Sequence, residues 1–485
     1  MCELVSETGI EETKESLTIK VIKGSGWMFS ARLTTRLVGF VGSLVLARIL
    51  SPDAYGLVTV GTLTISFLTV LTEVGFQQSL IQKHGDISPM LNTVWTIGVV
   101  RGCGISIVMF LLAPWIVDFF DLPEAISIVR VLSFQPLIYS LTNVHVVFFQ
   151  KNLEFSKQFI YEVSALLGNL IFGVGLAFLW QNAWALVWGQ LASVFIQMIV
   201  SYWLYPVFPK FEINWEYARN LYSFGKWVFL GGIVSYFTMR GDTYFVGKFF
   251  DAESLGIYAL AYRISNLPVN ELKSSLIRVL FPAYAKISND FQRIERAFFN
   301  AYEVLIAIML PACVGLALIA EDLVPVVLGD QWMGMVEVLE ILSVGAAFRA
   351  LLVAGSGLTY GMGKPKINFY VSLFSGGSLL TFMILFFRSW DILGVAGAVV
   401  LANLVGFLVW YLNIVMVLKV KWTTWIFRLI PIVIALLLMV FSIIFLHKGV
   451  HPSISRLIAS VVVGGIVYIS GLLFVNRVLP EEERG

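Results

Sequence analysis

Long apolar runs follow one another along almost the whole chain, and they constrain the fold more than any other feature of the sequence. An α-helix rises about 1.5 Å per residue, so crossing a hydrocarbon layer of about 30 Å takes about 20 mostly apolar residues. The composition agrees, because 58% of the 485 residues are hydrophobic and 13% are charged. Soluble domains are about 45–50% apolar and about 25% charged. We therefore expect an all-α polytopic membrane protein with little chain left for a soluble domain.

Polar breaks divide these runs into fourteen expected spanning helices. Some breaks carry turn residues, as in Ser51-Pro52-Asp53 and Gly363-Lys364-Pro365. Residues 1–24 are polar and Glu-rich, which is not the pattern of a signal peptide. The expected spans lie near residues 25–48, 55–81, 93–117, 125–149, 158–180, 183–205, 223–248, 254–282, 297–320, 333–360, 367–387, 392–418, 425–446 and 454–475.

Lysine and arginine are distributed unevenly over the breaks between these spans. Nineteen fall on one side of the membrane and four on the other, and cytoplasmic loops are the side enriched in basic residues. A missed span in the middle of the chain would invert the alternation downstream, so this split supports the span count. We expect both termini in the cytoplasm. The absence of an Asn-x-Ser/Thr sequon favours a prokaryotic plasma membrane, that is, an inner membrane where there are two.

The segment that begins at Trp27 aligns without gaps on the segment that begins at Trp227. The offset is 200 throughout, and the matched pairs include Arg48 with Lys248, Asp53 with Glu253 and Gly56 with Gly256. An even number of spans in each repeat preserves its orientation, so we expect two parallel, pseudo-symmetric lobes. The expected parts are a cytoplasmic tail (1–24), an N-lobe of six helices (25–205), a cytoplasmic linker (206–222), a C-lobe of six helices (223–418), and two extra helices with a cytoplasmic tail (419–485).

Several stretches carry a resemblance to a known group of transporters. They are the hairpin from Arg36 to Gly56, LGIYALAYRI (255–264), LFPAYAKI (280–287) and GMGKPKI (361–367). Over roughly residues 25–420 the chain resembles the polysaccharide exporters and flippases of the multidrug/oligosaccharidyl-lipid/polysaccharide transporter superfamily, and most of all the Wzx-type, colanic-acid and teichuronic-acid exporters. These motifs are strong indicators of the fold and weak indicators of the substrate.

The resemblance implies a MATE-like, V-shaped flippase that works by alternating access. Its substrate would be undecaprenyl-pyrophosphate-linked oligosaccharide, carried for cell-surface polysaccharide biosynthesis such as that of lipopolysaccharide. We expect no enzyme activity and no cofactor. The expected partners are the lipid-linked substrate, membrane lipids, and the polymerase and glycosyltransferases of the same pathway, with the chain itself a monomer. A net charge of +2 gives no reason to expect a nucleic acid partner.

Arginines placed well inside the expected spans are the main candidates for substrate binding. A charge near the bilayer centre costs at least about 2.5 kcal/mol, so it normally faces a bundle interior or a wet cavity. Guanidinium groups stay charged and match phosphate geometry, which fits a diphosphate headgroup. The alternative is that each arginine forms a structural ion pair or caps carbonyl groups. The predicted cationic cavity consists of Arg32, Arg36, Arg101, Arg240, Arg263 and Arg349.

Two polar stripes are predicted at helical spacing in the second and eighth spans, and the offset of 200 places them on equivalent faces. Their members include Ser66 and Glu73 in the first stripe, and Asn266, Asn270 and Lys273 in the second. One hypothesis is that Glu73 and Lys273 form an ion pair that closes an inner gate, and the alternative is that each finds a partner within its own lobe. Asp242 forms either a local pair with Arg240 or an ion-coupling site.

Two other functions stay open at this point. A drug/cation antiporter of the same superfamily would have fewer cavity arginines and usually twelve spans. A membrane glycosyltransferase or polysaccharide polymerase would need paired carboxylates on a sizeable outer loop, whereas the expected outer loops are short. The sequence contains no phosphate-binding loop and no Cys-x-x-Cys. We therefore expect no metal site and no hydrolase.

Overall fold

The computed structural model describes residues 38–72, 87–152, 154–272, 290–420, 422–448 and 451–478, together with Thr35, Leu280, Tyr284 and Ile287. All elements in these ranges are helices, and they supply 10 segments that are long and apolar enough to cross a membrane. The all-α polytopic class is confirmed, while the count of fourteen stays a prediction. The chain divides into two compact units, unit 1 (Met1–Leu50 and Val60–Ile233) and unit 2 (Ser51–Thr59 and Val234–Gly485).

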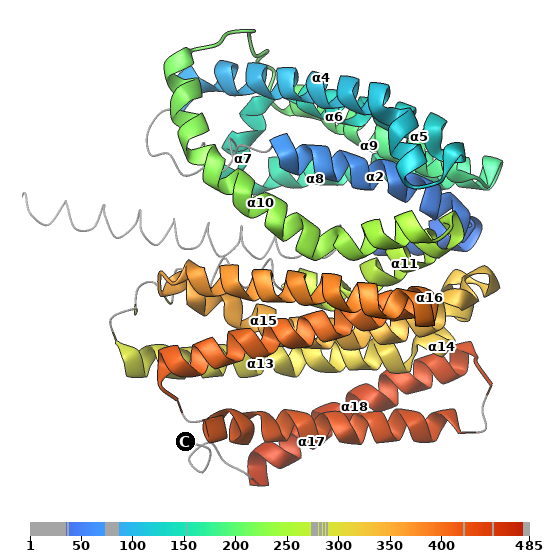
Figure 1. Ribbon diagram of the computed structural model, residues 1–485, viewed down its shortest axis with the longest axis vertical. Helices are drawn as coiled ribbons and strands as arrows, with labels where there is room; N and C mark the ends of the chain where they lie inside the picture. The colour runs from blue at the N-terminus through green and yellow to red at the C-terminus, as the bar shows by residue number, and fades with distance from the viewer. Residues whose placement is uncertain are drawn as a thin grey trace, which may run out of the picture. The chain divides into compact units, whose positions relative to one another are not determined.

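Unit 1 is built on five long helices (Figure 1). Helices α8 and α9 pack along each other, and their backbones approach closely where a Cβ atom on Gly189 would lie 2.8 Å from the Cα of Gly173. A left-handed residue, Gln181 with φ 50°, and the cap residue Asn182 form the turn between them. The five helices are α2 (Pro52–Thr72) from Val60 onward, α4 (Ser88–Phe119), α8 (Phe155–Trp180), α9 (Ala183–Leu204) and the first part of α10 (Trp215–Phe249).

The fourth expected span, 125–149, is not a single helix. The chain forms η1 (Pro123–Ala125), α5 (Ile126–Leu132), α6 (Phe134–Ser140), η2 (Val144–Val146) and α7 (Val147–Lys151) instead. Pro136 has no backbone N–H to donate within a helix, and Asn143 adopts an extended conformation in which its side chain accepts from the His145 N–H. The hydrophobic pattern therefore predicts an apolar segment here, but it does not predict where the helix is interrupted.

The segment after α9 is fastened to α4 by hydrogen bonds. The backbone N–H groups of Lys210, Glu212 and Asn214 donate to side-chain oxygens of Asn92, Thr96 and Thr93, at 3.1, 3.0 and 3.0 Å. The ring of Phe211 packs on the indole of Trp95 at 4.8 Å. Helix α10 then begins at Trp215, inside the stretch expected to be the linker. The stretch expected to be the linker is therefore held against α4 by hydrogen bonds and is partly helical.

Unit 2 contains helices that pack side by side around an aromatic core. That core includes Phe298, Tyr302, Trp410 and Trp425, all 3% exposed or less. The extra helices α17 and α18 pack along each other and both contact α13 (Figure 1). The elements are the end of α10, α11 (Ala252–Ser265), α13 (Phe291–Leu318), α14 (Ala320–Leu323), η3 (Val324–Leu328), η4 (Asp330–Met335), α15 (Val336–Gly361), α16 (Pro365–Leu418), α17 (Trp422–His447) and α18 (Ile454–Val478).

Helix α16 reverses direction part of the way along. Asp391 has a φ of 50°, which is left-handed, and a Cβ atom on Gly394 would lie 2.6 Å from the carbonyl oxygen of Phe386. Residues eight apart in a straight helix would be about 12 Å apart. The stretch therefore supplies two spans, Lys366–Phe386 and Asp391–Leu418, as expected.

Equivalent helices of the sequence repeat begin at equivalent residues. Helices α2 and α11 begin 200 residues apart, and Ser51 and Asp251 each accept a hydrogen bond from the backbone N–H three residues later. The two starts contact each other reciprocally within unit 2. A Cβ atom on Gly56 would lie 1.8 Å from the Ala252 carbonyl oxygen, and one on Gly256 would lie 1.9 Å from the Pro52 carbonyl oxygen. Only glycine at both positions permits this approach.

Candidate substrate-binding cavities

A polar cavity of about 300 Å³ lies within unit 2, among α10, α11, α15 and α16. Three residues predicted from the sequence line it: Asp242, Asn266 and Arg349. The guanidinium Nη1 of Arg349 donates to the Tyr262 hydroxyl and to the Asn266 Oδ1, both at 2.9 Å. Both of these partners are uncharged, so they hold the guanidinium in place without neutralising it.

The position of Asn266 follows from the local sequence. Helix α11 ends at Ser265, with Asn266 as the capping residue, two positions before Pro268. Proline cannot donate a backbone hydrogen bond and its ring crowds the preceding turn, so the helix is interrupted here. The amide of Asn266 donates to the Tyr262 carbonyl at 3.0 Å, which leaves its oxygen turned to Arg349.

Asp242 lies at the wall of the same cavity and is 2% exposed. Its carboxylate accepts from the Tyr258 hydroxyl at 2.9 Å and from the Thr243 backbone N–H at 2.7 Å. The guanidinium of Arg240 instead lies over the Tyr262 ring, 5.8 Å from its centroid. The described contacts of Asp242 therefore come from hydroxyl and amide groups rather than from the neighbouring arginine.

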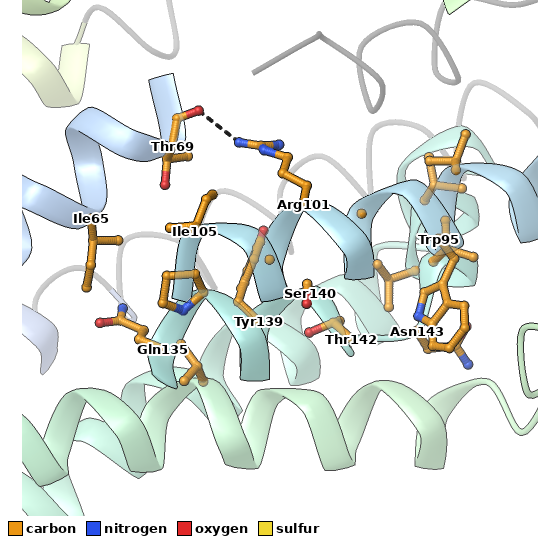
Figure 2. A pocket seen from close by; sticks show the side chains of 18 of the residues that line it. Ile65, Thr69, Trp95, Arg101, Ile105, Gln135, Tyr139, Ser140, Thr142 and Asn143 are labelled. Carbon is orange, nitrogen blue, oxygen red and sulfur yellow. Dashed lines mark hydrogen bonds between the residues drawn. The ribbon is translucent and has the colours of Figure 1, made fainter. Parts of the chain in front are cut away.

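A second cavity, of about 420 Å³, lies within unit 1 among α2, α4, α6, α8 and α9 (Figure 2). Arg101 on α4 lines it, with its Nε 2.8 Å from the Thr72 hydroxyl and its Nη2 2.9 Å from the Thr69 carbonyl oxygen. Arg101 thus connects α4 to α2 as well as lining the cavity.

The other predicted residues are placed differently. Arg240, Arg263, Asn270 and Ser66 are exposed, and the Ser66 hydroxyl donates to the Thr62 carbonyl of its own helix at 2.7 Å. The residues Arg32, Arg36, Glu73 and Lys273 lie outside the described residues, so the gate pair and the shared cationic cavity stay predictions. Among the described parts of the chain, no group of three or more His, Cys, Asp or Glu side chains could hold a metal ion.

Sequence reasoning missed Tyr262, which lines the unit 2 cavity, and the buried Tyr258, which donates to Asp242. Tyr258 and Tyr262 hold Asp242 and Arg349 respectively, and their rings lie 6.4 Å apart. The signal was available, because Tyr258, Tyr262 and Asn266 recur every four residues and so share one helix face. In unit 1 the missed lining residues are Trp95, Gln135, Thr142 and Asn143.

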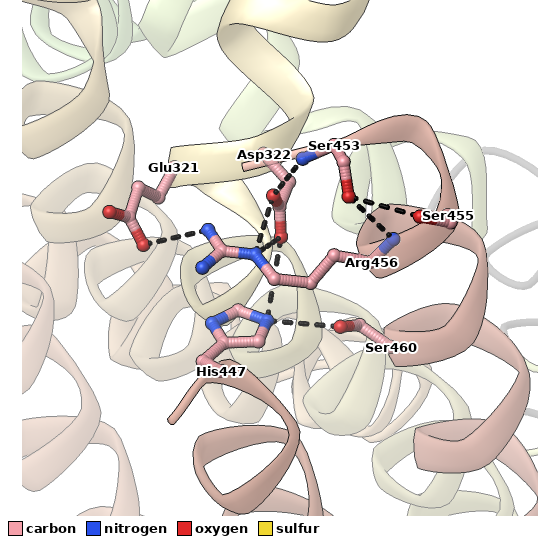
Figure 3. A network of polar contacts seen from close by, with 7 residues as sticks. All are labelled: Glu321, Asp322, His447, Ser453, Ser455, Arg456 and Ser460. Atoms are coloured by element: carbon pink, nitrogen blue, oxygen red, sulfur yellow. Dashed lines mark hydrogen bonds and ion pairs between the residues drawn. The ribbon is translucent and has the colours of Figure 1, made fainter. Parts of the chain in front are cut away.

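A buried charged cluster connects the extra helices to the rest of unit 2 (Figure 3). Asp322 is 0% exposed, and the Nε of Arg456 on α18 lies 2.7 and 2.8 Å from its two oxygens. The Nη2 of Arg456 lies 3.0 Å from Glu321, and the ring of His447 lies 3.5 Å from Asp322. Helix α18 is therefore joined to the chain after α13 by paired charges.

Known proteins similar to this chain were found by sequence and by structure. The chain is 27% identical to the lipopolysaccharide biosynthesis protein WzxC of Escherichia coli, over 74% of this chain and 73% of that protein. It is 24% identical to the teichuronic acid biosynthesis protein TuaB of Bacillus subtilis, over 84% of this chain and 85% of that protein.

The lipid II flippase MurJ, in an inward closed conformation, shares the fold. The TM-score is 0.75 at 16% identity, and the match covers 93% of this chain and 99% of that chain. A family model described as polysaccharide biosynthesis protein matches residues 45–337, which is more than half of the sequence. This chain therefore belongs to the polysaccharide biosynthesis protein family.

Proposed function

We propose that the chain is a flippase that moves lipid-linked oligosaccharide across a bacterial membrane for cell-surface polysaccharide biosynthesis. It is a multi-pass transporter and not an enzyme. Support comes from the family, from relatives named for lipopolysaccharide and teichuronic acid biosynthesis, and from the fold shared with a lipid II flippase. The repeat register at α2 and α11 fits a mechanism of alternating access by two similar halves.

The observation that carries the proposal is the environment of Arg349. It lies on α15, within a span, and its guanidinium is held by the neutral groups of Tyr262 and Asn266. A positive charge kept at membrane depth needs a functional reason, because its burial is costly. An anionic diphosphate headgroup supplies that reason, since guanidinium and phosphate form charge-assisted hydrogen bonds.

Flipping measured in inverted membrane vesicles tests this proposal. The substrate is fluorescent, lipid-linked glycan, and the readout is its movement to the vesicle lumen. Arg349→Gln keeps a polar side chain but removes the charge. A charge-assisted hydrogen bond contributes about 1.5–3 kcal/mol, so we expect flipping to slow at least about tenfold. Arg130→Gln is the matched control, because Arg130 is exposed and its guanidinium lies over Phe110.

Wild type and the Arg130 variant should flip the glycan at rates within about twofold of each other, in line with the small effects of most surface substitutions. Equal rates for the Arg349 variant would remove Arg349 from the substrate path. Sugar transfer from a nucleotide donor would overturn the transporter assignment.

A drug/cation antiporter is the second candidate, and Asp242 is the observation that favours it. A buried carboxylate within a span is suited to binding a proton or a cation. An antiporter should extrude an organic cation and lose this activity in Asp242→Asn, without any requirement for lipid-linked glycan. In the flippase, Asp242 is instead the candidate for ion coupling.

The remaining parts of the proposal concern location and partners. We place the chain in the inner or plasma membrane with both termini in the cytoplasm, based on the distribution of lysine and arginine between the spans. We propose that it works as a monomer, next to the glycosyltransferases and the polymerase of its pathway. Glu73 and Lys273 are proposed as a pair that closes the cytoplasmic gate.

A further inference from the structure

The end of α9 and the chain that leads into α10 carry an exposed apolar surface, most of it aromatic. A single exposed apolar residue needs no explanation, but a contiguous apolar patch marks a site that contacts a protein or a membrane. We call this surface the aromatic patch. Its residues and their exposed fractions are Trp203 (72%), Val207 (46%), Phe208 (75%), Phe211 (71%), Ile213 (43%) and Trp215 (78%).

The backbone that carries the aromatic patch is fixed to unit 1. The Nδ2 of Asn143 donates to the carbonyl oxygens of Tyr205 and Val207, at 2.8 and 2.9 Å. Further along, the hydrogen bonds to α4 described above hold the N–H groups of residues 210, 212 and 214. The patch is therefore presented by a backbone that is held in place, and not by a loop that could turn its aromatic side chains inward.

The charged residues near the aromatic patch are few. Between Trp203 and Trp215 the sequence contains only Lys210 and Glu212 as charged residues. The Glu212 carboxylate accepts from the Nδ2 of Asn92 on α4 at 3.1 Å, so it is held by unit 1. The side chain of Lys210 is exposed, and a lysine can lay its apolar stem along an apolar surface while its ammonium group reaches phosphate. This combination of aromatic rings and one lysine matches the chemistry of a phospholipid surface.

The aromatic patch continues a row of exposed apolar residues on α9. That helix is long and apolar enough to span a membrane, and Phe195, Ile199 and Trp203 are 49%, 50% and 72% exposed. Residues four apart share one face of a helix, so this row faces the hydrocarbon and ends at Trp203, close to the end of the span. Tryptophan is enriched at the membrane–water interface, because its ring is apolar and its N–H is polar. This continuity favours lipid over a partner protein as the molecule that covers the patch.

We infer that the aromatic patch is a lipid-binding surface that inserts into the boundary between the headgroups and the acyl chains of one leaflet. The assignment to the cytoplasmic leaflet rests on the orientation given with the proposed function, whereas the contact with lipid does not. The same stretch of chain is bonded to α4 and leads into α10. The leaflet therefore holds the beginnings of both helices at one depth.

Nitroxide spin labels on single cysteines test the contact with lipid. The three cysteines of the chain, Cys2, Cys103 and Cys313, are replaced by alanine to give a background chain. This chain is reconstituted alone in vesicles of phosphatidylethanolamine and phosphatidylglycerol. Labels at Phe208→Cys and Ile213→Cys should collide more with oxygen, which dissolves among acyl chains, than with a water-soluble nickel chelate. Their depth below the phosphates should be about 5–10 Å, as for interfacial amphipathic helices.

The matched control is a label at Glu124→Cys, since Glu124 is an exposed, charged residue of a short connection between helices. That label should collide mainly with the nickel chelate. The same behaviour at both Phe208→Cys and Ile213→Cys would overturn the inference, and a partner protein would then be the molecule to seek for the patch.

A second measurement decides if the background chain is not monodisperse. Wild type and Trp215→Phe are compared in vesicles that contain brominated phosphatidylcholine, in which bromine quenches nearby tryptophan. The emission lost in Trp215→Phe should belong to the quenched fraction. In the control Trp332→Phe it should belong to the unquenched fraction, because Trp332 is 0% exposed. An unquenched Trp215 would also overturn the inference.

The leaflet is tested separately with a membrane-impermeant maleimide on Lys210→Cys. We expect labelling in inverted membrane vesicles and none in spheroplasts. Labelling in spheroplasts alone would refute the proposed orientation and leave the lipid contact intact. A chain that flips lipid-linked glycan while its patch is open to water would refute the lipid contact alone, and a chain that fails to flip while its labels lie in lipid would refute the proposed function alone.

Discussion

The reciprocal contact between Gly56 and Gly256 makes a sharp prediction about stability. In Gly56→Ala the new Cβ atom would lie 1.8 Å from the carbonyl oxygen and 2.7 Å from the carbonyl carbon of Ala252. Carbon and oxygen atoms that are not bonded need about 3 Å or more, so the starts of α2 and α11 must separate by about 1 Å. Backbone atoms cannot rotate away as a side chain can.

The magnitude follows from the cost of overpacking, which is about 1–3 kcal/mol for extra methyl groups in a packed interior. For a unit of 150–250 residues, 1 kcal/mol changes the Tm by about 2–4 °C. We therefore expect Gly56→Ala to lower the Tm of the purified protein by about 2–12 °C, measured by thermal unfolding in detergent. Gly377→Ala is the control, because a Cβ atom there would meet no atom within 4 Å and alanine favours helix.

The reciprocity of the contact provides the decisive comparison. Once Gly56→Ala has separated the two helix starts, Gly256→Ala should cost less in the double variant than it does alone, because the two sites share one contact. A Tm for Gly56→Ala equal to that of wild type would refute the reasoning. Strict additivity of the two changes would also refute it, since it would mean that the glycines act independently.

Two ion pairs in unit 2 give the remaining predictions. Asp322→Asn should lower the free energy of unfolding by about 3 kcal/mol, because it removes the buried charged partner of Arg456. The control Glu124→Gln changes an exposed carboxylate and should alter the free energy of unfolding little. A denaturation curve of Asp322→Asn that matches wild type would contradict this prediction. Arg428→Gln should cost less, about 1 kcal/mol, because the Arg428 and Glu303 side chains are 22% and 20% exposed. The exchange Arg428→Glu with Glu303→Arg should restore part of that loss in the same measurement, and a further loss would show that packing of Arg428 on Phe299 dominates.

The sequence predicted the features that follow from periodicity and from the cost of buried charge. The offset of 200 located the matching starts of α2 and α11. Of the arginines chosen for their depth, Arg349 lines the unit 2 cavity and Arg101 lines the unit 1 cavity. The depth of a residue in an expected span does not determine the direction in which its side chain points, however. Arg263 is exposed and lines neither of the two cavities described above, so its place in a shared cationic cavity stays a prediction.

Partners and helix breaks were the least predictable features. Ser66 was placed on a polar stripe, yet its hydroxyl donates to the Thr62 carbonyl, which is a bond available to any serine in a helix. The unit 1 cavity was not anticipated, because it depends on the breaks around Pro136 and Asn143. Those breaks bring residues from several short helices together in a way that hydrophobicity does not reveal.

The docking of residues 210–214 on α4 has a consequence for how motion is transmitted along the chain. Three backbone N–H groups are held by Asn92, Thr93 and Thr96, and α10 starts at the next residue, Trp215. A displacement of α10 therefore acts directly on the N-terminal end of α4. The same end of α4 carries Trp95, so residues 210–214 connect the position of α10 to the wall of the unit 1 cavity.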